Sequence, residues 1–212
     1  MKELTVKERI AKRVADFFTS GDLVSLGVGV PALVPAFLPE GANIWMLADN
    51  GMIGGIPLEE GEEVDVFVKD TGDHYNRLLP GGCYLSSATS FGLVRGGHLD
   101  YTVLGAMQVD SQGNLANWMV PGGKMAGMGG AMDLVTGSKQ VIVAMEHCTK
   151  AGKPKILKQC TFPLTGEHVV DWIVTELGVM RITERGLCLV ETAPGVTIEE
   201  VREKTEAEVY TE

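Results

Sequence analysis

Several sequence features that mark common functional classes are missing from this 212-residue chain. Its four cysteines form no Cys-x-x-Cys pair and its four histidines show no metal-ligand spacing, so the pattern predicts reduced thiols and no metal site. Basic residues are scarce, with 18 Lys and Arg against 28 Asp and Glu. The resulting net charge of −10 argues against a nucleic-acid or anionic-membrane surface, because both need a basic patch.

Long hydrophobic runs and nucleotide fingerprints are also missing. The most apolar stretch, residues 23–38, contains two glycines and two prolines, so it is not expected to span a membrane. The first residues carry no apolar signal region, which favours a cytoplasmic protein. The pair Gly27 and Gly29 lacks the third glycine of a dinucleotide site, and no Lys-Ser/Thr follows it, so the use of NAD or ATP is not supported.

What the chain does contain is apolar side chain and glycine. Hydrophobic residues make up 45% of it, enough for one sizeable core, and we expect a single domain over residues 1–212. Its 27 glycines are roughly twice the usual share. They fall in short clusters without a repeat period, which indicates loops where the backbone approaches something closely.

The order of the expected elements indicates an open α/β sheet. A capping box of Thr5 and Glu8 starts a helix over residues 5–19, and a strand at 23–27, a glycine turn and a helix-like 32–37 form a βα unit. Further strands are expected at 43–48, 64–69, 101–109, 140–146, 155–160 and 186–191, and a last helix at 197–210. The predicted fold is one largely parallel or mixed sheet with helices on both faces.

Two segments could carry chemistry. Asp49 ends a buried strand, where ligands of open α/β sheets bind, although Asp-Asn-Gly is also an ordinary turn sequence. The run 127–130 contains three glycines, whose main-chain N–H groups can face an oxyanion. A tight loop beside a neighbouring strand explains the same glycines equally well.

Taken in order, these segments resemble the β subunit of the family I CoA-transferases, the 3-oxoacid type that moves CoA between a short acyl-CoA and a free carboxylic acid. The resemblance covers nearly the whole chain. It rests on the blocks Leu-Gly-Val-Gly-Val-Pro at 26–31, Asp-Asn-Gly at 49–51, Arg-Gly-Gly-His-Leu-Asp at 95–100, Leu-Gly-Ala-Met-Gln-Val-Asp at 104–110, Gly-Met-Gly-Gly-Ala-Met-Asp-Leu at 127–134 and Pro-Leu-Thr-Gly at 163–166.

The resemblance implies an active site at the junction of an α and a β subunit, in an αβ or α2β2 assembly. The carboxylate of the family's Ser-Glu-Asn-Gly signature falls on Asp49, and the amide of its oxyanion hole falls on Gly130, with Gly129 next. Gly27 and Gly29 match a loop that lies near CoA. Coenzyme A enters as a substrate, and no permanently bound cofactor is implied.

One departure from the family concerns the reacting group itself. The signature here reads Ala-Asp-Asn-Gly at 48–51, so Asp49 stands where the family has Glu. Aspartate keeps the carboxylate but retracts it by roughly a bond length, and a misplacement of about 1 Å can cost on the order of 10²-fold in rate. The favoured interpretation is a CoA-transferase that uses Asp49. The alternatives are an acyl-CoA hydrolase with Asp49 as general base, a replacement introduced into an enzyme that carries Glu, and an inactive assembly subunit.

Overall fold

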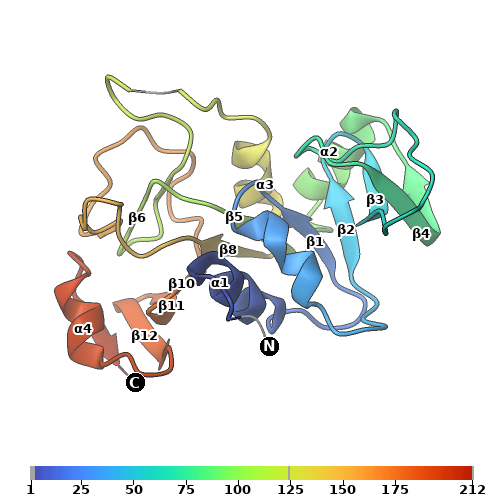
Figure 1. Ribbon diagram of the computed structural model, residues 1–212. Helices are drawn as coiled ribbons and strands as arrows, with labels where there is room; N and C mark the ends of the chain where they lie inside the picture. Colours follow the sequence, from blue (N-terminus) through green and yellow to red (C-terminus); the bar gives the residue numbers. More distant parts are fainter. Residues whose placement is uncertain (1–2, 124, 212) are drawn as a thin grey trace.

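The computed structural model describes residues 3–123 and 125–211, and a ten-stranded mixed sheet forms its centre (Figure 1). The strand order is β13-β12-β11-β10-β8-β5-β1-β2-β3-β4. The five central strands run parallel: β1 (Leu23–Leu26), β2 (Trp45–Ala48), β5 (Tyr101–Leu104), β8 (Gln140–Ala144) and β10 (Trp172–Thr175). Their carboxyl ends therefore meet at one edge of the sheet.

Both flanks of this parallel centre are extended by hairpins. On one side β2 continues into antiparallel β3 (Met52–Pro57) and β4 (Asn76–Tyr84). On the other side β10 continues into antiparallel β11 (Gly178–Thr183) and β12 (Gly186–Thr192), and β13 (Val209–Thr211) lies parallel to β12. The sheet is thus mixed.

Helices cover both faces of the sheet, which confirms the predicted α/β class. Alternate side chains of β8 pack on opposite faces: Val141 and Val143 belong to one apolar cluster, and Ile142 to another. The face of Ile142 is covered by α1 (Val6–Ala15) and the 3-10 helix η1 (Pro31–Phe37). The opposite face is covered by α2 (Ser87–Arg95) and α3 (Ala131–Gly137) (Figure 1).

Several local predictions are confirmed. The capping box forms at the start of α1, where Thr5 Oγ1 accepts the Glu8 N–H and the Glu8 carboxylate accepts the Thr5 N–H. The strands expected at 23–27, 43–48, 140–146 and 186–191 are β1, β2, β8 and β12. The helix-like segment 32–37 is present as η1, in the tighter 3-10 form.

The continuous strand expected over 101–109 is wrong, because the chain leaves the main sheet after Leu104. The Asn117 side chain donates to the Gly105 carbonyl at 3.3 Å, and the Met107 N–H donates to the Ala116 carbonyl at 3.0 Å. The chain then enters a separate three-stranded sheet, of order β7-β6-β9, formed by β6 (Gln108–Asp110), β7 (Leu115–Ala116) and β9 (Ile156–Leu157).

Three other expected elements need correction. The last helix, α4 (Ile198–Glu203), ends well before residue 210, because the chain then joins the sheet as β13 and buries Val209. The strand expected at 155–160 is reduced to β9. The segment 64–69 is a turn with a single bridge from Lys69 to Tyr75, since Val64 and Val66 are exposed and find no neighbouring strand.

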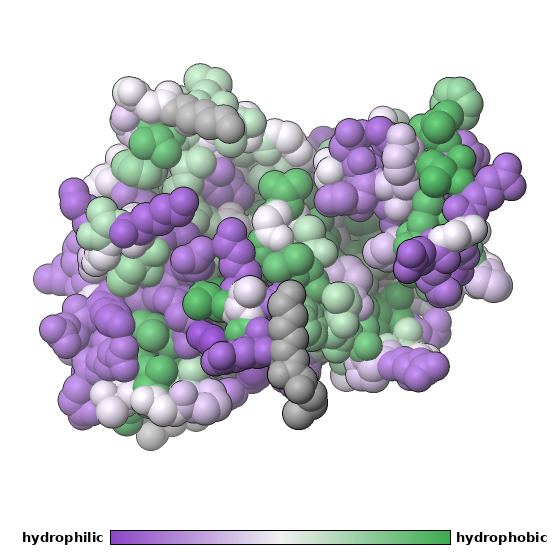
Figure 2. All heavy atoms as spheres, in the orientation of Figure 1, coloured by the Kyte–Doolittle hydropathy of each residue, from purple (hydrophilic) through white to green (hydrophobic). Residues whose placement is uncertain are grey.

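The β3–β4 lobe carries exposed apolar side chains. Val64, Val66 and Phe67 lie in the connection between these two strands, and Phe67 is 93% exposed. Figure 2 shows apolar side chains gathered on the outer side of this lobe. No helix within the described ranges is long and apolar enough to cross a membrane.

Candidate active site

The carboxyl edge of the parallel strands gathers most of the residues that the sequence singles out. Gly27 and Gly29 follow β1, and Asp49 follows β2. Glu146 follows β8, and Glu176 follows β10. Ligands of open α/β sheets bind at this edge, so the topology places these residues where chemistry is expected.

Asp49 is held at the apex of the hairpin between β2 and β3. The Gly51 N–H donates to the Ala48 carbonyl at 2.9 Å, and the Leu85 N–H donates to the Gly51 carbonyl at 2.8 Å. Gly51 has φ +120°, and a Cβ there would overlap the Leu85 carbonyl oxygen. Glycine is therefore required at this position, and it fixes the turn that presents Asp49.

The carboxylate of Asp49 is half-buried. Burial raises the pKa of Asp49 above its usual value, while hydrogen bonding to the backbone N–H groups of Asn50 and Asp49 itself opposes the rise. Among the described residues no Lys, Arg or His lies within ion-pair distance of it. The result is a partly desolvated carboxyl group with no cation beside it, which makes it a stronger base and nucleophile than a surface aspartate.

Gly130 lies directly against this carboxylate. It precedes α3 and has φ −82°, a value that any residue adopts. A Cβ at Gly130 would nevertheless overlap Asp49 Oδ2 and would lie 2.9 Å from Phe91 Cε1. Space therefore requires the glycine, and the fold brings the start of α3 into contact with Asp49.

The amides at the start of α3 are available as donors. No acceptor within residues 3–123 and 125–211 receives a hydrogen bond from the N–H groups of Gly129 or Gly130. Gly129 is exposed and has φ +52°. Unpaired N–H groups at a helix start carry partial positive charge, so they suit a developing oxyanion beside Asp49. The assignment of Gly130 as that donor stays a prediction.

Gly27 and Gly29 line a different space. A cavity of about 490 Å³ lies between η1, β1–β3 and the loop at residues 70–74, and its wall includes both glycines and Ala48. Asp49 is not in this wall. Leu47, two residues before Asp49 on β2, packs on the α2–α3 face. Leu47 also lines the cavity, so the predicted site residues form two neighbouring groups at the end of β2: Asp49 with Gly130, and Gly27 with Gly29.

Two contributors to the site, Phe91 and Asp70, were not identified from the sequence, whereas Arg95 belongs to the block at 95–100. Phe91 on α2 supports Gly130, and Arg95, one helical turn later, lies with Cζ 5.7 Å from the Phe91 ring centroid and donates to Asp133 Oδ1 at 2.7 Å. The i, i+4 spacing of Phe91 and Arg95 was the available signal. No feature of the sequence predicts that Asp70 lines the cavity, because its position depends on how the long connection between β3 and β4 folds back over β2 and β3.

The arrangement offers the Asp49 carboxylate and the backbone N–H groups at the start of α3 as reactive or stabilising groups. Within the described part of the chain, no group of three His, Cys, Asp or Glu side chains is placed to hold a metal ion.

Comparison with known proteins identifies relatives over the full length. A model of the family Coenzyme A transferase matches residues 7–204. The chain is 49% identical over 204 residues to the beta subunit of the acetate CoA-transferase of Escherichia coli (strain K12), covering 96% of this chain and 93% of that protein. It is 44% identical over 210 residues to one subunit of the probable succinyl-CoA:3-ketoacid coenzyme A transferase of Bacillus subtilis (strain 168), covering 98% of this chain and 95% of that protein.

Solved structures share the fold at lower identity. An acyl-CoA transferase from Escherichia coli O157:H7 superposes with a TM-score of 0.80 at 22% identity, over 100% of this chain and 43% of that chain. The glutaconate coenzyme A-transferase of Acidaminococcus fermentans superposes with a TM-score of 0.73 at 20% identity, over 98% of this chain and 86% of that chain. This chain therefore corresponds to less than half of the first of these chains and to most of the second.

Proposed function

The chain belongs to the coenzyme A transferase family, as a β subunit, and we propose that it moves CoA between short-chain acyl or 3-oxoacyl groups and free carboxylates. The acetate and succinyl-CoA:3-ketoacid names of its relatives support this substrate range. The observation that carries the proposal is the contact of the Asp49 carboxylate with Gly130 at the start of α3.

The proposed reaction begins with Asp49. Its carboxylate attacks the thioester carbonyl of the acyl-CoA, the C–S bond breaks, and CoA leaves as thiolate, so that the acyl group remains on Asp49 as a mixed anhydride. The thiolate then attacks the Asp49 carbonyl, so that the acyl group departs as a free carboxylate and CoA remains on Asp49 as a thioester. A second carboxylate takes CoA from Asp49 by the reverse sequence. In each step negative charge develops on a carbonyl oxygen, where the Gly130 N–H would donate.

The apolar cavity beside β2 is proposed to hold part of the CoA arm. Its wall contains Gly27, Gly29 and Ala48, and Ala48 is joined directly to Asp49. A CoA whose sulfur lies at Asp49 can therefore enter this cavity with the arm against the 27–29 loop. The glycines suit such a role, since they let the backbone approach a ligand closely.

An α subunit is proposed to complete the site. Large apolar side chains are exposed around it, with Val28 at 69%, Met125 at 63% and Met132 at 50%. Exposed apolar side chains beside a binding site are typical of a protein interface. The relatives are named as single subunits of their enzymes, which supports such a partner, in an αβ or α2β2 assembly.

The proposal is tested by trapping the intermediate on the complex reconstituted with its α subunit. Incubation with acyl-CoA should leave CoA on the peptide that contains Asp49, detected by mass spectrometry and lost on treatment with hydroxylamine. Borohydride should convert the same thioester to an alcohol. Asp49→Ala should abolish the adduct and the transfer, while Asp49→Asn tests whether the charge is needed at nearly unchanged shape.

Hydrolysis is the second candidate activity, and the raised pKa of Asp49 favours it. The short side chain leaves room for a water between the carboxylate and the thioester, and Asp49 would then take a proton from that water. Free acid that accumulates without an acceptor, with no adduct on Asp49, would establish this alternative over transfer. Asp49→Glu also distinguishes hydrolysis from transfer, since the longer side chain should increase the rate of transfer and decrease the rate of hydrolysis.

A further inference from the structure

Asn50, the residue after Asp49, joins the turn of the β2–β3 hairpin to a distant loop. Its side chain is exposed, and its amide group donates to the Lys69 carbonyl at 2.9 Å. Lys69 lies in the long connection between β3 and β4, 19 residues further along the chain. The hydrogen bond therefore couples the turn that presents Asp49 to a segment that its own sequence does not place there.

The loop that accepts this bond, residues 69–75, is closed by hydrogen bonds of its own. Lys69 and Tyr75 at its two ends form an antiparallel bridge. Between them the Asp70 N–H donates to the His74 carbonyl at 3.0 Å, and the His74 N–H donates to Asp70 Oδ1 at 3.0 Å. A loop closed in this way keeps its shape, so a displacement moves it as one unit.

The Asn50 amide makes the polar contact that sets where this loop lies relative to β2. Within residues 3–123 and 125–211, no other hydrogen bond or ion pair joins residues 69–75 to a residue outside the segment 68–76. The base of the loop is fixed separately, where the Asn76 N–H donates to the Val68 carbonyl at 3.1 Å. Loss of the Asn50 bond therefore leaves the loop attached at its base alone.

The same loop forms one side of the cavity of about 490 Å³ beside β2. Four of its residues line the cavity: Asp70, Thr71, Gly72 and His74. The wall also contains Ala48, which is joined directly to Asp49. Displacement of the loop would open this cavity to solvent next to the reacting carboxylate. A closed site protects reactive intermediates from hydrolysis, because it excludes water.

We propose that Asn50 is a positioning residue that favours transfer over hydrolysis, because its bond to Lys69 holds the 69–75 loop in place and keeps water from the intermediate on Asp49. The inference rests on the proposed function, since it takes the CoA thioester of Asp49 as that intermediate. In the reaction that Asn50 suppresses, water attacks the Asp49 carbonyl and the C–S bond breaks. CoA leaves as a thiol with one proton of the water, the other proton passes to solvent, and Asp49 returns to a carboxylate.

The test measures the lifetime of the Asp49 thioester on the complex reconstituted with its α subunit. The adduct is formed with acyl-CoA and separated from free ligands by rapid gel filtration. Its decay without an acceptor is then followed by mass spectrometry of the peptide that contains Asp49. A second measurement gives the ratio of hydrolysis to transfer with an acceptor present. Neither quantity depends on the fraction of active protein, so partial unfolding of a variant does not change them.

Two variants remove the hydrogen bond and one matched control keeps it. Asn50→Ala deletes the amide, and Asn50→Asp keeps its shape but replaces the donor by a carboxylate that repels the Lys69 carbonyl. Both changes concern an exposed side chain, so the fold is expected to persist. Lys69→Gln is the control. It removes the ion pair of Lys69 Nζ with Asp73 Oδ1, 2.7 Å apart in the same loop, but leaves the carbonyl that accepts from Asn50.

We expect the thioester to decay about fivefold faster in both Asn50 variants, since one ordinary hydrogen bond shifts the equilibrium between the held and the displaced loop by about that factor. The ratio of hydrolysis to transfer should rise to the same extent. Lys69→Gln should match the unmodified complex in both measurements.

Three outcomes overturn the role of Asn50 and leave the proposed transfer standing. The first is an unchanged lifetime and ratio in Asn50→Ala. The second is faster decay in Asn50→Asp alone, which would assign the effect to the added carboxylate acting as a base. The third is equally fast decay in Lys69→Gln. Absence of any adduct in the unmodified complex would instead refute the transfer itself, and the role of Asn50 with it.

Discussion

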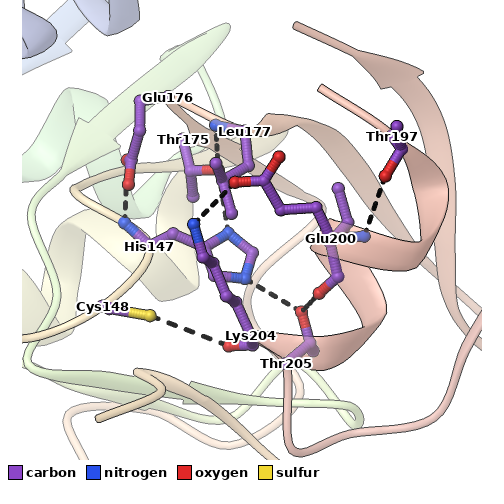
Figure 3. A network of polar contacts seen from close by, with 10 residues as sticks. His147, Cys148, Thr175, Glu176, Leu177, Thr197, Glu200, Lys204 and Thr205 are labelled. Atoms are coloured by element: carbon purple, nitrogen blue, oxygen red, sulfur yellow. Dashed lines mark hydrogen bonds and ion pairs between the residues drawn. The ribbon is translucent and has the colours of Figure 1, made fainter. Parts of the chain in front are cut away.

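Acidification is expected to destabilise this protein through His147. Its side chain is fully buried, and burial, followed by the positive charges of Lys204 and Lys155, lowers the pKa of His147 to about 4. Thr205 Oγ1 donates to the Val201 carbonyl at 2.7 Å. The His147 Nε2–H therefore donates to Thr205, and Nδ1 accepts from the Thr175 hydroxyl (Figure 3). A proton added at Nδ1 would remove this acceptor, and the Thr175 hydroxyl would have to donate to the more distant Gly178 carbonyl, 3.5 Å away.

The magnitude follows from the difference between the folded and unfolded states. In the unfolded chain the pKa of His147 returns to 6.5, so below that pH the unfolded state takes up a proton that the folded state does not. The free energy of unfolding then falls by about 1.4 kcal/mol per pH unit until the folded pKa of about 4 is reached. Between pH 7 and pH 5 the loss amounts to roughly 2 kcal/mol.

Urea unfolding of the full chain, followed by tryptophan fluorescence at pH 7 and pH 5, measures this loss. In His147→Gln the titrating group is gone, so its stability should fall by about 2 kcal/mol less than that of the unmodified chain over the same interval. Other groups, such as Asp49 and Asp171 with their raised pKa values, contribute equally to both proteins and cancel. His98→Gln, at an exposed histidine, is the control and should behave as the unmodified chain. Equal losses in His147→Gln and the unmodified chain would refute the reasoning.

Three further substitutions test the site and the elements that hold it. Gly130→Ala should lower transfer about 10²-fold, because the added methyl group displaces the Asp49 carboxylate, and steady-state kinetics of the complex measures the loss. Gly51→Ala should lower the free energy of unfolding by about 1–3 kcal/mol and should also lower transfer, since alanine is strained at φ +120° and overlaps the Leu85 carbonyl. Chemical denaturation and the kinetic assay measure the two effects, and unchanged stability would contradict the strain at this turn. Thr197→Ala should cost about 1 kcal/mol of stability and leave kcat unchanged, because Thr197 Oγ1 accepts the Glu200 N–H at the start of α4, far from Asp49, and a changed kcat would contradict this separation.

Much of the fold could be predicted because it depends on neighbours in sequence. The capping box of α1 involves residues three apart, and the apolar runs of β1, β2 and β8 reflect burial on both faces. The candidate site was also predictable in part. Asp49 follows the apolar run 43–48 and precedes a turn that contains Gly51, so the sequence of residues 43–51 alone predicts its place at the carboxyl edge.

The errors fall where distant segments decide the outcome. The run 101–109 is nearly continuous in apolar residues, but hydrogen bonds from Asn117 and to Ala116 divert the chain after Leu104. The segment 204–210 has helical spacing, yet its end joins β12 as a parallel strand. Val64 and Val66, which are exposed, find no strand to pair with. Local pattern does not contain this information, since pairing partners lie far away along the chain.

The sequence by itself determined the α/β class, the carboxylate at position 49 and the glycine clusters around it. Only the tertiary structure decided which glycines lie beside that carboxylate. It placed Gly130 against Asp49, and it placed Gly27 and Gly29 in the wall of a cavity that does not include Asp49. It also brought the Asn50 amide to the Lys69 carbonyl. The physical reason is that residue types set local conformation, whereas these contacts arise from strand order and from the face on which each helix packs.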